Sequence, residues 1–242
     1  MDDKISKFKQ LIDESNNIVF FGGAGVSTES GIPDFRSKNG LYNQKYDYPP
    51  ETILSHSFFM SHTDEFFKFY REKMNSLEVS PNIAHRKLAE LEEKGKLKAI
   101  ITQNIDGLHQ KAGSKNVFEL HGSVMRNYCI ECHRTHTPNY VFYETTGIPI
   151  CQKRKCNGIV KPDVVLYEEM LDDEVVAGAV DAISNCDTLI VGGTSLTVYP
   201  ASGLINYFRG DNLVLINRDP TPFDARADLV INEPLSVVFM NL

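Results

Sequence analysis

Two patterns of apolar residues alternate along the chain: short, fully apolar runs, and longer segments in which apolar residues recur every three or four positions. Residues 5–12 show the longer spacing, and the apolar run 18–21 follows them and stops at Gly22. A short apolar run is typical of a buried strand, and the longer spacing of an amphipathic helix. The start of the chain therefore predicts a helix, a buried strand and a glycine turn.

The same alternation continues through most of the chain. Asn82 is placed to cap a helix that ends at Gly95, and residues 97–102 form a second apolar run. A helix is predicted over residues 173–184, and further strands over residues 188–191, 213–217 and 229–231. Strands that alternate with helices favour an α/β fold with a mostly parallel, doubly wound sheet.

Two segments interrupt this alternation. Residues 31–80 are rich in aromatic residues and histidine, and residues 66–74 within them suggest a packed helix. Residues 126–158 contain most of the cysteines and little apolar periodicity. We expect these two segments to build a smaller domain over the sheet.

Four of the five cysteines lie in the second of these segments. They form a C-x2-C pair and a C-x4-C pair: Cys129, Cys132, Cys151 and Cys156. Two short-spaced pairs joined by a long loop are typical of a tetrahedral zinc site, and four thiolates leave no open position, so the zinc would be structural. The alternatives are free buried cysteines, or a site in which His133 or His136 replaces one cysteine.

Glycine turns follow two of the predicted strands. The run after residue 21 contains Gly22, Gly23 and Gly25, and Gly192 and Gly193 follow the strand at 188–191. Glycines let backbone N–H groups approach a phosphate at a helix N-terminus. With a polar residue at the end of a third strand, they favour a dinucleotide site over purely structural turns. An ordinary dehydrogenase is disfavoured, because the acidic residue expected about twenty positions later is missing.

Two polar clusters also follow apolar runs. Gln103-Asn104-Ile105-Asp106 comes directly after the run 97–102, and His121 follows the run 117–120. A histidine at a strand end beside a nucleotide can act as a general base near neutral pH. The alternative for His121 is a structural histidine.

Composition places the chain among ordinary globular proteins. Of its 242 residues, 42% are hydrophobic and 24% are charged, which argues against a disordered chain. The formal net charge of -7 disfavours broad nucleic-acid binding, so no direct nucleic-acid partner is expected. No run approaches the roughly 18 apolar residues that span a bilayer, and residues 1–4 do not begin an export signal. We therefore expect a cytoplasmic protein without a membrane partner.

Taken in order, these motifs resemble the sirtuins, a family of NAD-dependent protein lysine deacylases. The residues that carry the resemblance are Gly23-Ala24-Gly25-Val26-Ser27, Gly31-Ile32-Pro33-Asp34-Phe35-Arg36, Thr102-Gln103-Asn104-Ile105-Asp106-Gly107-Leu108-His109, Leu120-His121-Gly122, the four cysteines and Gly193-Thr194-Ser195-Leu196. The resemblance implies a Rossmann-type NAD-binding domain and a small domain made of a helical module and a zinc-ribbon module, with substrates bound between the two domains. The implied bounds are 1–31, 81–125 and 159–242 for the Rossmann-type domain, 32–80 for the helical module and 126–158 for the zinc module.

The resemblance also implies roles for single residues. His121 matches the general base, and Asn104 belongs to the nicotinamide pocket and takes part in catalysis. Val165, Tyr167 and Glu168 would contact an acetyl-lysine-bearing protein or peptide. The residues implied in NAD contacts are Ala24, Thr28, Phe35, Arg36, Gln103, Ile105, Asp106, Thr194, Ser195 and Asn217.

The implied reaction uses NAD as a co-substrate. The acyl-lysine oxygen attacks the ribose carbon as nicotinamide leaves, and His121 then takes a proton from a ribose hydroxyl so that the acyl group moves to ADP-ribose. A pocket that excludes water protects the cationic intermediate from hydrolysis. The alternatives are removal of another neutral acyl group, mono-ADP-ribosyl transfer, and a non-catalytic binding module, which would need neither His121 nor Asn104.

Two features depart from the family pattern, and a third bears on the choice of acyl group. The second cysteine pair is C-x4-C rather than C-x2-C, which lengthens a zinc loop without removing a ligand. Glu168 replaces a glycine in the segment that pairs with the peptide, and a glutamate at the rim favours basic flanking residues. Phe67 and Tyr70 match the Tyr and Arg of members that remove acidic acyl groups. Without that arginine a succinyl carboxylate would be buried unpaired, so acetyl or another neutral acyl group is expected.

Overall fold

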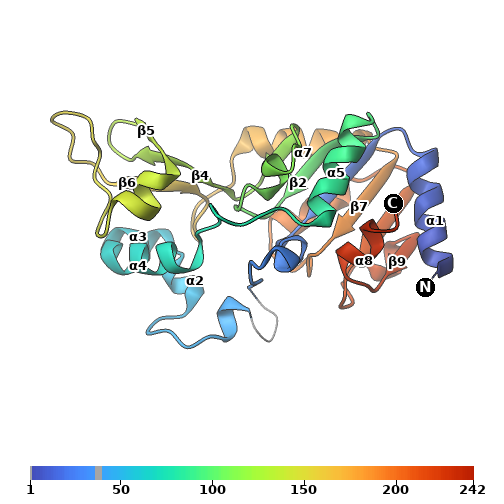
Figure 1. Cartoon of the computed structure of the whole chain (residues 1–242), viewed down its shortest axis with the longest axis horizontal. Coiled ribbons are helices and arrows are strands. Elements are labelled where there is room, and N and C mark those ends of the chain that lie inside the picture. The colour runs from blue at the N-terminus through green and yellow to red at the C-terminus, as the bar shows by residue number, and fades with distance from the viewer. Residues whose placement is uncertain (1, 36–39) are drawn as a thin grey trace.

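The computed structural model describes residues 2–35 and 40–242. The molecule is elongated and has two lobes: Figure 1 shows a sheet flanked by helices on the right, and short helices beside a second sheet on the left. Both ends of the chain lie in the larger, right-hand lobe.

Within the described residues, six strands form the sheet of the large lobe in the order β3-β2-β1-β7-β8-β9. Every neighbouring pair is parallel, which confirms the predicted parallel sheet. The predicted strands agree with the observed ones to within one residue at each end. The strands are β1 (Ile18–Gly22), β2 (Leu97–Thr102), β3 (Val117–Glu119), β7 (Thr188–Gly192), β8 (Asn212–Ile216) and β9 (Leu229–Ile231).

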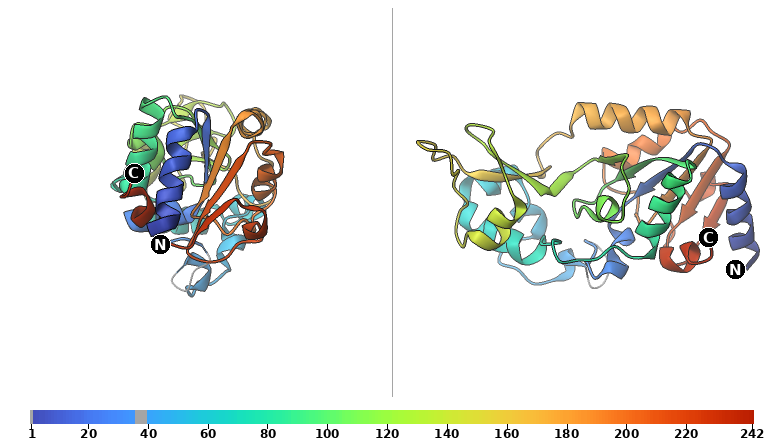
Figure 2. Two further views of the ribbon diagram at one scale, coloured as in Figure 1. Left: turned by 90° about the vertical axis from the view of Figure 1, so that its right-hand side faces the viewer. Right: turned by 45° about the horizontal axis from the view of Figure 1, so that its top comes forward.

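Helices cover both faces of this sheet, as Figure 2 shows. Phe20 of β1 packs in a core with residues of α1, α5 and α8, whereas its neighbour Phe21 packs in a second core with residues of α7 and η5. Because both faces are buried, the strands consist mainly of apolar residues. The bounds are α1 (Asp2–Glu14), α5 (Ile83–Glu93), α6 (Leu108–Lys111), α7 (Asp173–Asn185), α8 (Leu235–Phe239) and the 3-10 helices η5 (Ala201–Tyr207) and η6 (Asp224–Arg226).

The helix predicted after Asn82 is α5. The Asn82 side chain accepts hydrogen bonds from the backbone N–H groups of Ala84 and His85, so it caps the helix as expected. Among the helices of residues 2–35 and 40–242, none combines the length and the apolar character that crossing a membrane requires.

The small lobe combines short helices with a three-stranded antiparallel sheet of order β5-β4-β6. Phe66, Phe67 and Tyr70 of its longest helix are fully buried, and the Tyr70 ring stacks on Phe142 with ring centroids 5.2 Å apart. The two segments that interrupt the α/β alternation therefore share one aromatic core. The bounds are α2 (Pro50–Ile53), α3 (His56–Ser61), α4 (Thr63–Lys73), β4 (Gly122–Cys129), β5 (Thr135–His136), β6 (Val160–Val164), the 3-10 helix η3 (Leu41–Asn43) and the π-helical turn η4 (Tyr140–Glu144).

Strands β4 and β6 were not predicted from the sequence. Lys161, Pro162 and Asp163 fill the middle of β6, so this strand has no apolar run or regular alternation. The pairing joins residues far apart in the chain and lies partly outside the segment 126–158, since β4 begins at Gly122 and β6 begins at Val160.

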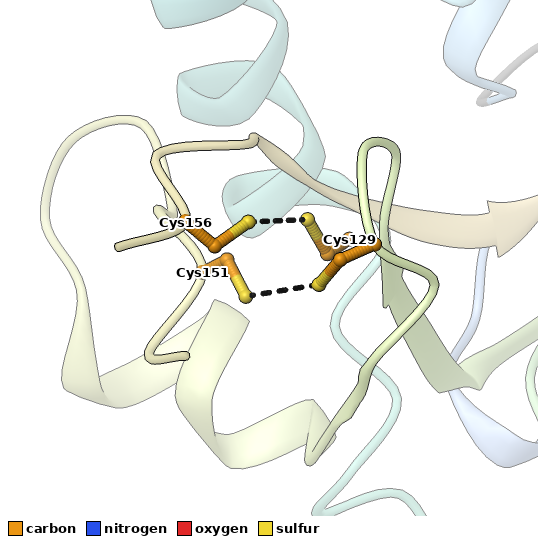
Figure 3. A group of neighbouring side chains, drawn as sticks. Cys129, Cys151 and Cys156 are labelled. Carbon is orange, nitrogen blue, oxygen red and sulfur yellow. Dashed lines mark hydrogen bonds between the residues drawn. The ribbon is translucent and has the colours of Figure 1, made fainter. Parts of the chain in front are cut away.

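The four predicted cysteine ligands lie between the end of β4 and the start of β6 (Figure 3). Their sulfur atoms all lie within 4.8 Å of one another, with 3.6 Å between Cys129 and Cys156 and 3.7 Å between Cys132 and Cys151. Zinc–sulfur bonds of about 2.3 Å place the sulfurs of a tetrahedral site about 3.8 Å apart, whereas a disulfide is only about 2.05 Å long. The four thiols therefore fit one structural zinc ion, and neither His133 nor His136 belongs to the group.

Removal of one cysteine ligand tests this site. We expect Cys132→Ser to abolish the binding of one zinc per chain and to lower the melting temperature by roughly 10 °C, since several kcal/mol of metal-binding free energy would be lost. Elemental analysis of the purified protein and thermal unfolding measure the two effects. Cys186→Ala, at the buried cysteine of the large lobe, is the matched control and should keep its zinc. Full zinc content in Cys132→Ser would contradict the assignment.

Candidate active site

A cavity of about 810 Å³ opens between the two lobes at the carboxyl ends of the parallel strands. Its size is within the range of about 300–1,000 Å³ that is usual for ligand and cofactor sites. Arg36 lies outside the described residues, and Glu168 does not line the cavity. The predicted site residues that do line it are Ala24, Thr28, Phe35, Gln103, Asn104, Ile105, Asp106, His121, Val165, Tyr167, Thr194, Ser195 and Asn217.

The two glycine turns meet where the strand order reverses. The chain moves outward from β1 to β2 and β3 and then returns to β7 beside β1, so these turns flank the point where open α/β sheets bind ligands. Gly25 N donates to the Gly193 carbonyl at 2.8 Å. A Cβ atom added to Gly25 would lie 2.8 Å from the Gly193 Cα, so the glycines allow the turns to pack against each other.

The first glycine turn does not lead into an α-helix. It continues as two short 3-10 helices, η1 (Ala24–Val26) and η2 (Thr28–Ser30), and Thr28 Oγ1 donates back to the Gly25 carbonyl at 3.1 Å. Glycine, serine and threonine are poor helix formers, which accounts for the difference from the expected helix N-terminus. A phosphate at this turn would be bound by backbone N–H groups without the dipole of a long helix.

Predicted NAD-binding residues from neighbouring strands form a row of polar groups along the sheet edge. Gln103 Nε2, after β2, donates to Thr194 Oγ1, after β7, at 3.0 Å. Ser195 Oγ lies 2.8 Å from Thr197 Oγ1, and Asn217 Nδ2, after β8, donates to the Asp219 carbonyl at 2.7 Å. The row therefore extends from β2 to β8, as a long dinucleotide requires.

A buried hydrogen-bond network orients Asn104 and Asp106. Ser27 Oγ donates to Asp106 Oδ2 at 2.7 Å and accepts from Asn104 Nδ2 at 3.1 Å, while Asp106 Oδ1 accepts from the Leu108 N–H at 2.9 Å. Burial raises the pKa of Asp106, and the hydrogen bonds from Ser27 and Leu108 oppose that shift.

Ser27 and His85 were assigned no role from the sequence. Ser27 is only 1% exposed, and His85 Nε2 lies 3.5 Å from its hydroxyl oxygen. Burial, with a smaller effect of the Arg86 charge, lowers the pKa of His85 to about 4, so this imidazole is neutral. The position of Ser27 within the glycine motif was the one signal in the sequence, but its buried contacts appear only in the fold.

His121 lies in the turn between β3 of the large sheet and β4 of the small sheet. Its Nδ1 atom lies 2.8 Å from the Gln103 carbonyl oxygen, which can only accept a hydrogen bond. Nδ1 therefore carries the proton in the neutral ring, and Nε2 is left as the basic atom. Burial lowers the pKa of His121, and the bond to Gln103 partly offsets this effect. A neutral imidazole of this kind can accept a proton from a bound hydroxyl.

Gly122, the next residue, allows the two crossing segments to approach closely. Its φ of 74° is in the left-handed region, and an added Cβ atom would lie only 2.0 Å from the Asp163 carbonyl oxygen. Beside this contact, Val165 N donates to the His121 carbonyl at 2.9 Å. The candidate base and the segment predicted to bind peptide are therefore held side by side.

The predicted peptide residues follow β6. Val165 and Tyr167 line the cavity, and the Tyr167 and Tyr42 hydroxyls are hydrogen-bonded to each other. The Glu168 carboxylate points elsewhere: its Oε2 and Oε1 accept from Ser57 N and Ser57 Oγ, each at 2.9 Å. Both oxygens of the Glu168 carboxylate are thus hydrogen-bonded within the protein and are not free to give the expected preference for basic flanking residues.

The chain is similar to known proteins along almost all of its length. Residues 23–200 match the model of the Sir2 family. An NAD-dependent protein deacetylase of Clostridium perfringens is 65% identical over 241 residues, which cover 98% of this chain and 98% of that protein. One of Clostridium acetobutylicum is 62% identical over 238 residues, which cover 98% of this chain and 96% of that protein.

Solved structures are similar over the same length. A Sir2 structure with a deacetylated p53 peptide and 3'-O-acetyl ADP-ribose has a TM-score of 0.90 at 40% identity and covers 98% of this chain and 96% of its own. A Sir2 structure with a p53 peptide and NAD+ has a TM-score of 0.86 at 40% identity, with coverage of 98% and 95%. The sequence motifs, the two-lobed fold and these matches agree: the chain belongs to the Sir2 family, the sirtuins.

Proposed function

We propose that this protein is an NAD-dependent protein lysine deacetylase, which transfers the acetyl group of acetyl-lysine to ADP-ribose and releases nicotinamide. The observation that carries the proposal is the hydrogen bond from His121 Nδ1 to the Gln103 carbonyl, which leaves Nε2 basic in a cavity lined by the predicted NAD and peptide residues. Relatives with 65% and 62% identity bear the name NAD-dependent protein deacetylase. A structurally similar Sir2 protein holds a deacetylated peptide and acetyl ADP-ribose, the products of this reaction.

NAD would lie along the polar edge of the parallel sheet. Bound there, it supplies the ribose carbon that the acetyl oxygen attacks and the hydroxyl that receives the acetyl group. Phe35 would shield the nicotinamide ribose, and Gln103 would hold a ribose. Residues assigned to the NAD loop are Ala24, Thr28, Phe35 and, by resemblance alone, Arg36. Those assigned to the nicotinamide pocket are Asn104, Ile105 and Asp106, and those assigned to the phosphate or adenosine side are Thr194, Ser195 and Asn217.

The proposed catalytic residues are His121 and Asn104. His121 Nε2 would take the proton of a ribose hydroxyl, while the Gln103 carbonyl holds Nδ1 and keeps the ring oriented. Asn104 would act in the nicotinamide pocket, where its side chain is oriented by Ser27. Placement between two lobes limits the access of water, which would otherwise compete for the activated ribose.

The proposed macromolecular substrate is a protein or peptide that bears acetyl-lysine. Val165 and Tyr167 line the cavity where the modified lysine would enter, and neither a nucleic acid nor a membrane is part of the proposal.

We also propose the domain bounds given above, with the addition that β4 and β6 join the zinc module to the large lobe. A cytoplasmic location is proposed because the four clustered thiols fit a zinc site rather than disulfides, which suits a reducing compartment.

The first test is turnover of an acetyl-lysine peptide. We expect loss of the acetyl group and release of nicotinamide only when NAD is added, measured by peptide mass and nicotinamide assay. His121→Ala should lower kcat/KM by about 100-fold or more, because a general base contributes about 10²–10⁴-fold. His62→Ala, at an exposed histidine of the small lobe, is the matched control and should keep the activity. Transfer of label from NAD to protein without deacetylation would instead favour mono-ADP-ribosyl transfer.

The pH profile tests the state of His121. A base acts when neutral, and burial lowers the pKa of His121 below its ordinary value of 6.5. As the pH falls, the midpoint of the decline in kcat/KM should therefore lie below pH 6.5, since this ratio reports groups of the free enzyme. Activity recovered after return to neutral pH controls for acid unfolding. An acid limb with its midpoint above pH 6.5 would contradict the assignment.

Acyl preference follows from the residues of α4. Phe67 and Tyr70 carry no charge, and the next cation, Arg71, is held by the Val141 and Gly147 carbonyls and the Thr145 hydroxyl. We expect kcat/KM for a succinyl-lysine peptide to be at least about 100-fold lower than for the acetyl peptide, since the carboxylate would lose its hydration without a partner. The Phe67→Tyr/Tyr70→Arg double variant should narrow this ratio. Equal turnover of the two peptides by the wild type would refute the expectation.

A further inference from the structure

The segment after β6, residues 165–169, is tied to the start of α3 by its backbone. We name it the substrate loop. Tyr167 N donates to the Leu54 carbonyl at 2.9 Å, and His56 N donates to the Tyr167 carbonyl at 3.0 Å. These bonds form a short parallel bridge between Ser55 and Tyr167. One edge of the loop is therefore occupied by the helical segment of the small lobe.

Glu168 adds a second, side-chain connection to the same helix. Its two carboxylate oxygens accept from Ser57 N and Ser57 Oγ, each at 2.9 Å. Ser57 is in the first turn of α3, where backbone N–H groups have no partner within the helix. The carboxylate supplies such a partner, and charge-assisted bonds of this kind are stronger than neutral ones.

The backbone of Glu168 shows why this connection matters. Its φ is 76°, and among the described non-glycine residues only His133, Lys155 and Leu196 share a positive φ. Glycine adopts this left-handed region readily, whereas a residue with a Cβ atom does so only when its surroundings hold it there. Here the two bonds to Ser57 hold it. The chain thus keeps a conformation that favours glycine while using a side chain that fixes it.

Glu169 fixes the other end of the loop. Its Oε1 lies 2.9 Å from His56 Nδ1, and its Oε2 accepts from the Leu166 N–H at 2.9 Å and from Lys161 Nζ at 3.1 Å. Together with the Val165 bond to His121, these contacts attach the loop to the candidate base at one end and to α3 at the other.

Three backbone groups of the loop remain unpaired among the described residues, and we call them its open edge. Within residues 2–35 and 40–242, the Val165 carbonyl and both backbone groups of Glu168 have no hydrogen-bond partner. Unpaired backbone groups beside a cavity can pair with an extended peptide, because such a peptide adds to an exposed edge through main-chain hydrogen bonds. This edge lies next to Val165 and Tyr167, which line the cavity.

We propose that Glu168 is a positioning residue for the peptide substrate: by binding Ser57 through its carboxylate, it holds the substrate loop so that the open edge can pair with the main chain of an acetyl-lysine peptide. Its charge is used within the protein and does not select basic residues that flank the lysine. This inference rests on the deacetylase activity proposed above.

Steady-state kinetics of loop variants test the proposal. We expect Glu168→Gly to raise the KM for an acetyl-lysine peptide about 5–10-fold while kcat and the KM for NAD stay within about 2-fold, the signature of lost uniform binding. Ser57→Ala removes one of the two bonds, so its KM should rise about 2–4-fold, and the double variant should match Glu168→Gly because both act through one contact. Ser6→Ala, at an exposed serine of α1 in the large lobe, is the matched control and should behave as the wild type.

A second measurement separates positioning from charge recognition. The ratio of kcat/KM for an arginine-flanked and an alanine-flanked peptide should be the same in the wild type and Glu168→Gly. In Glu168→Gly, an unchanged or lower peptide KM, or a fall in kcat at constant KM, would overturn the proposal. So would additive effects on KM in the double variant, or loss in Glu168→Gly of a wild-type preference for the arginine-flanked peptide. If the wild type shows no NAD-dependent deacetylation, the proposed function fails first, and direct binding of the acetyl peptide to the same variants still tests the loop.

Discussion

The two lobes are joined through a close backbone contact between Gly122 and the carbonyl of Asp163. A Cβ atom at residue 122 would lie 2.0 Å from that oxygen, so only glycine lets the outgoing strand β4 and the returning strand β6 pair directly after leaving the large sheet. The residues on either side, His121 and Val165, share a backbone hydrogen bond. The distance between the candidate base and the substrate loop is thus set by main-chain packing, which side-chain motion does not disturb.

Burial sets the protonation states of the groups around the cavity below this junction. Asp106 lines the cavity, while His85 lies behind Ser27 and packs against His109. Desolvation lowers the pKa of both imidazoles and keeps them neutral. In a low-dielectric environment hydrogen bonds are stronger and an unpaired charge is costly, so the Ser27 network fixes Asn104 and Asp106 in a single arrangement. Burial also lowers the pKa of His121, so its ring stays neutral and can act as a base.

The small lobe supports the mouth of the cavity. Its aromatic core is completed by residues from both interrupting segments, and its four cysteines fit the zinc ion that would hold the long loop between β4 and β6. Because the substrate loop is hydrogen-bonded to Leu54, His56 and Ser57, its conformation depends on this lobe rather than on the parallel sheet. The small lobe, which contributes no proposed catalytic residue, therefore helps to set the conformation of the substrate loop and its open edge.

The parallel sheet, the cap at Asn82 and the cysteine cluster could be predicted from the sequence, because each depends on local pattern: apolar runs, capping chemistry and ligand spacing. Most of the site residues that the family resemblance implied line the cavity. Three features become visible only in the folded chain: β4 pairs with β6, Ser27 binds Asn104 and Asp106 with His85 behind it, and the Glu168 carboxylate binds Ser57. These features depend on contacts between residues far apart in the chain, and no local pattern of polar and apolar positions records which distant backbone or hydroxyl group a side chain will meet.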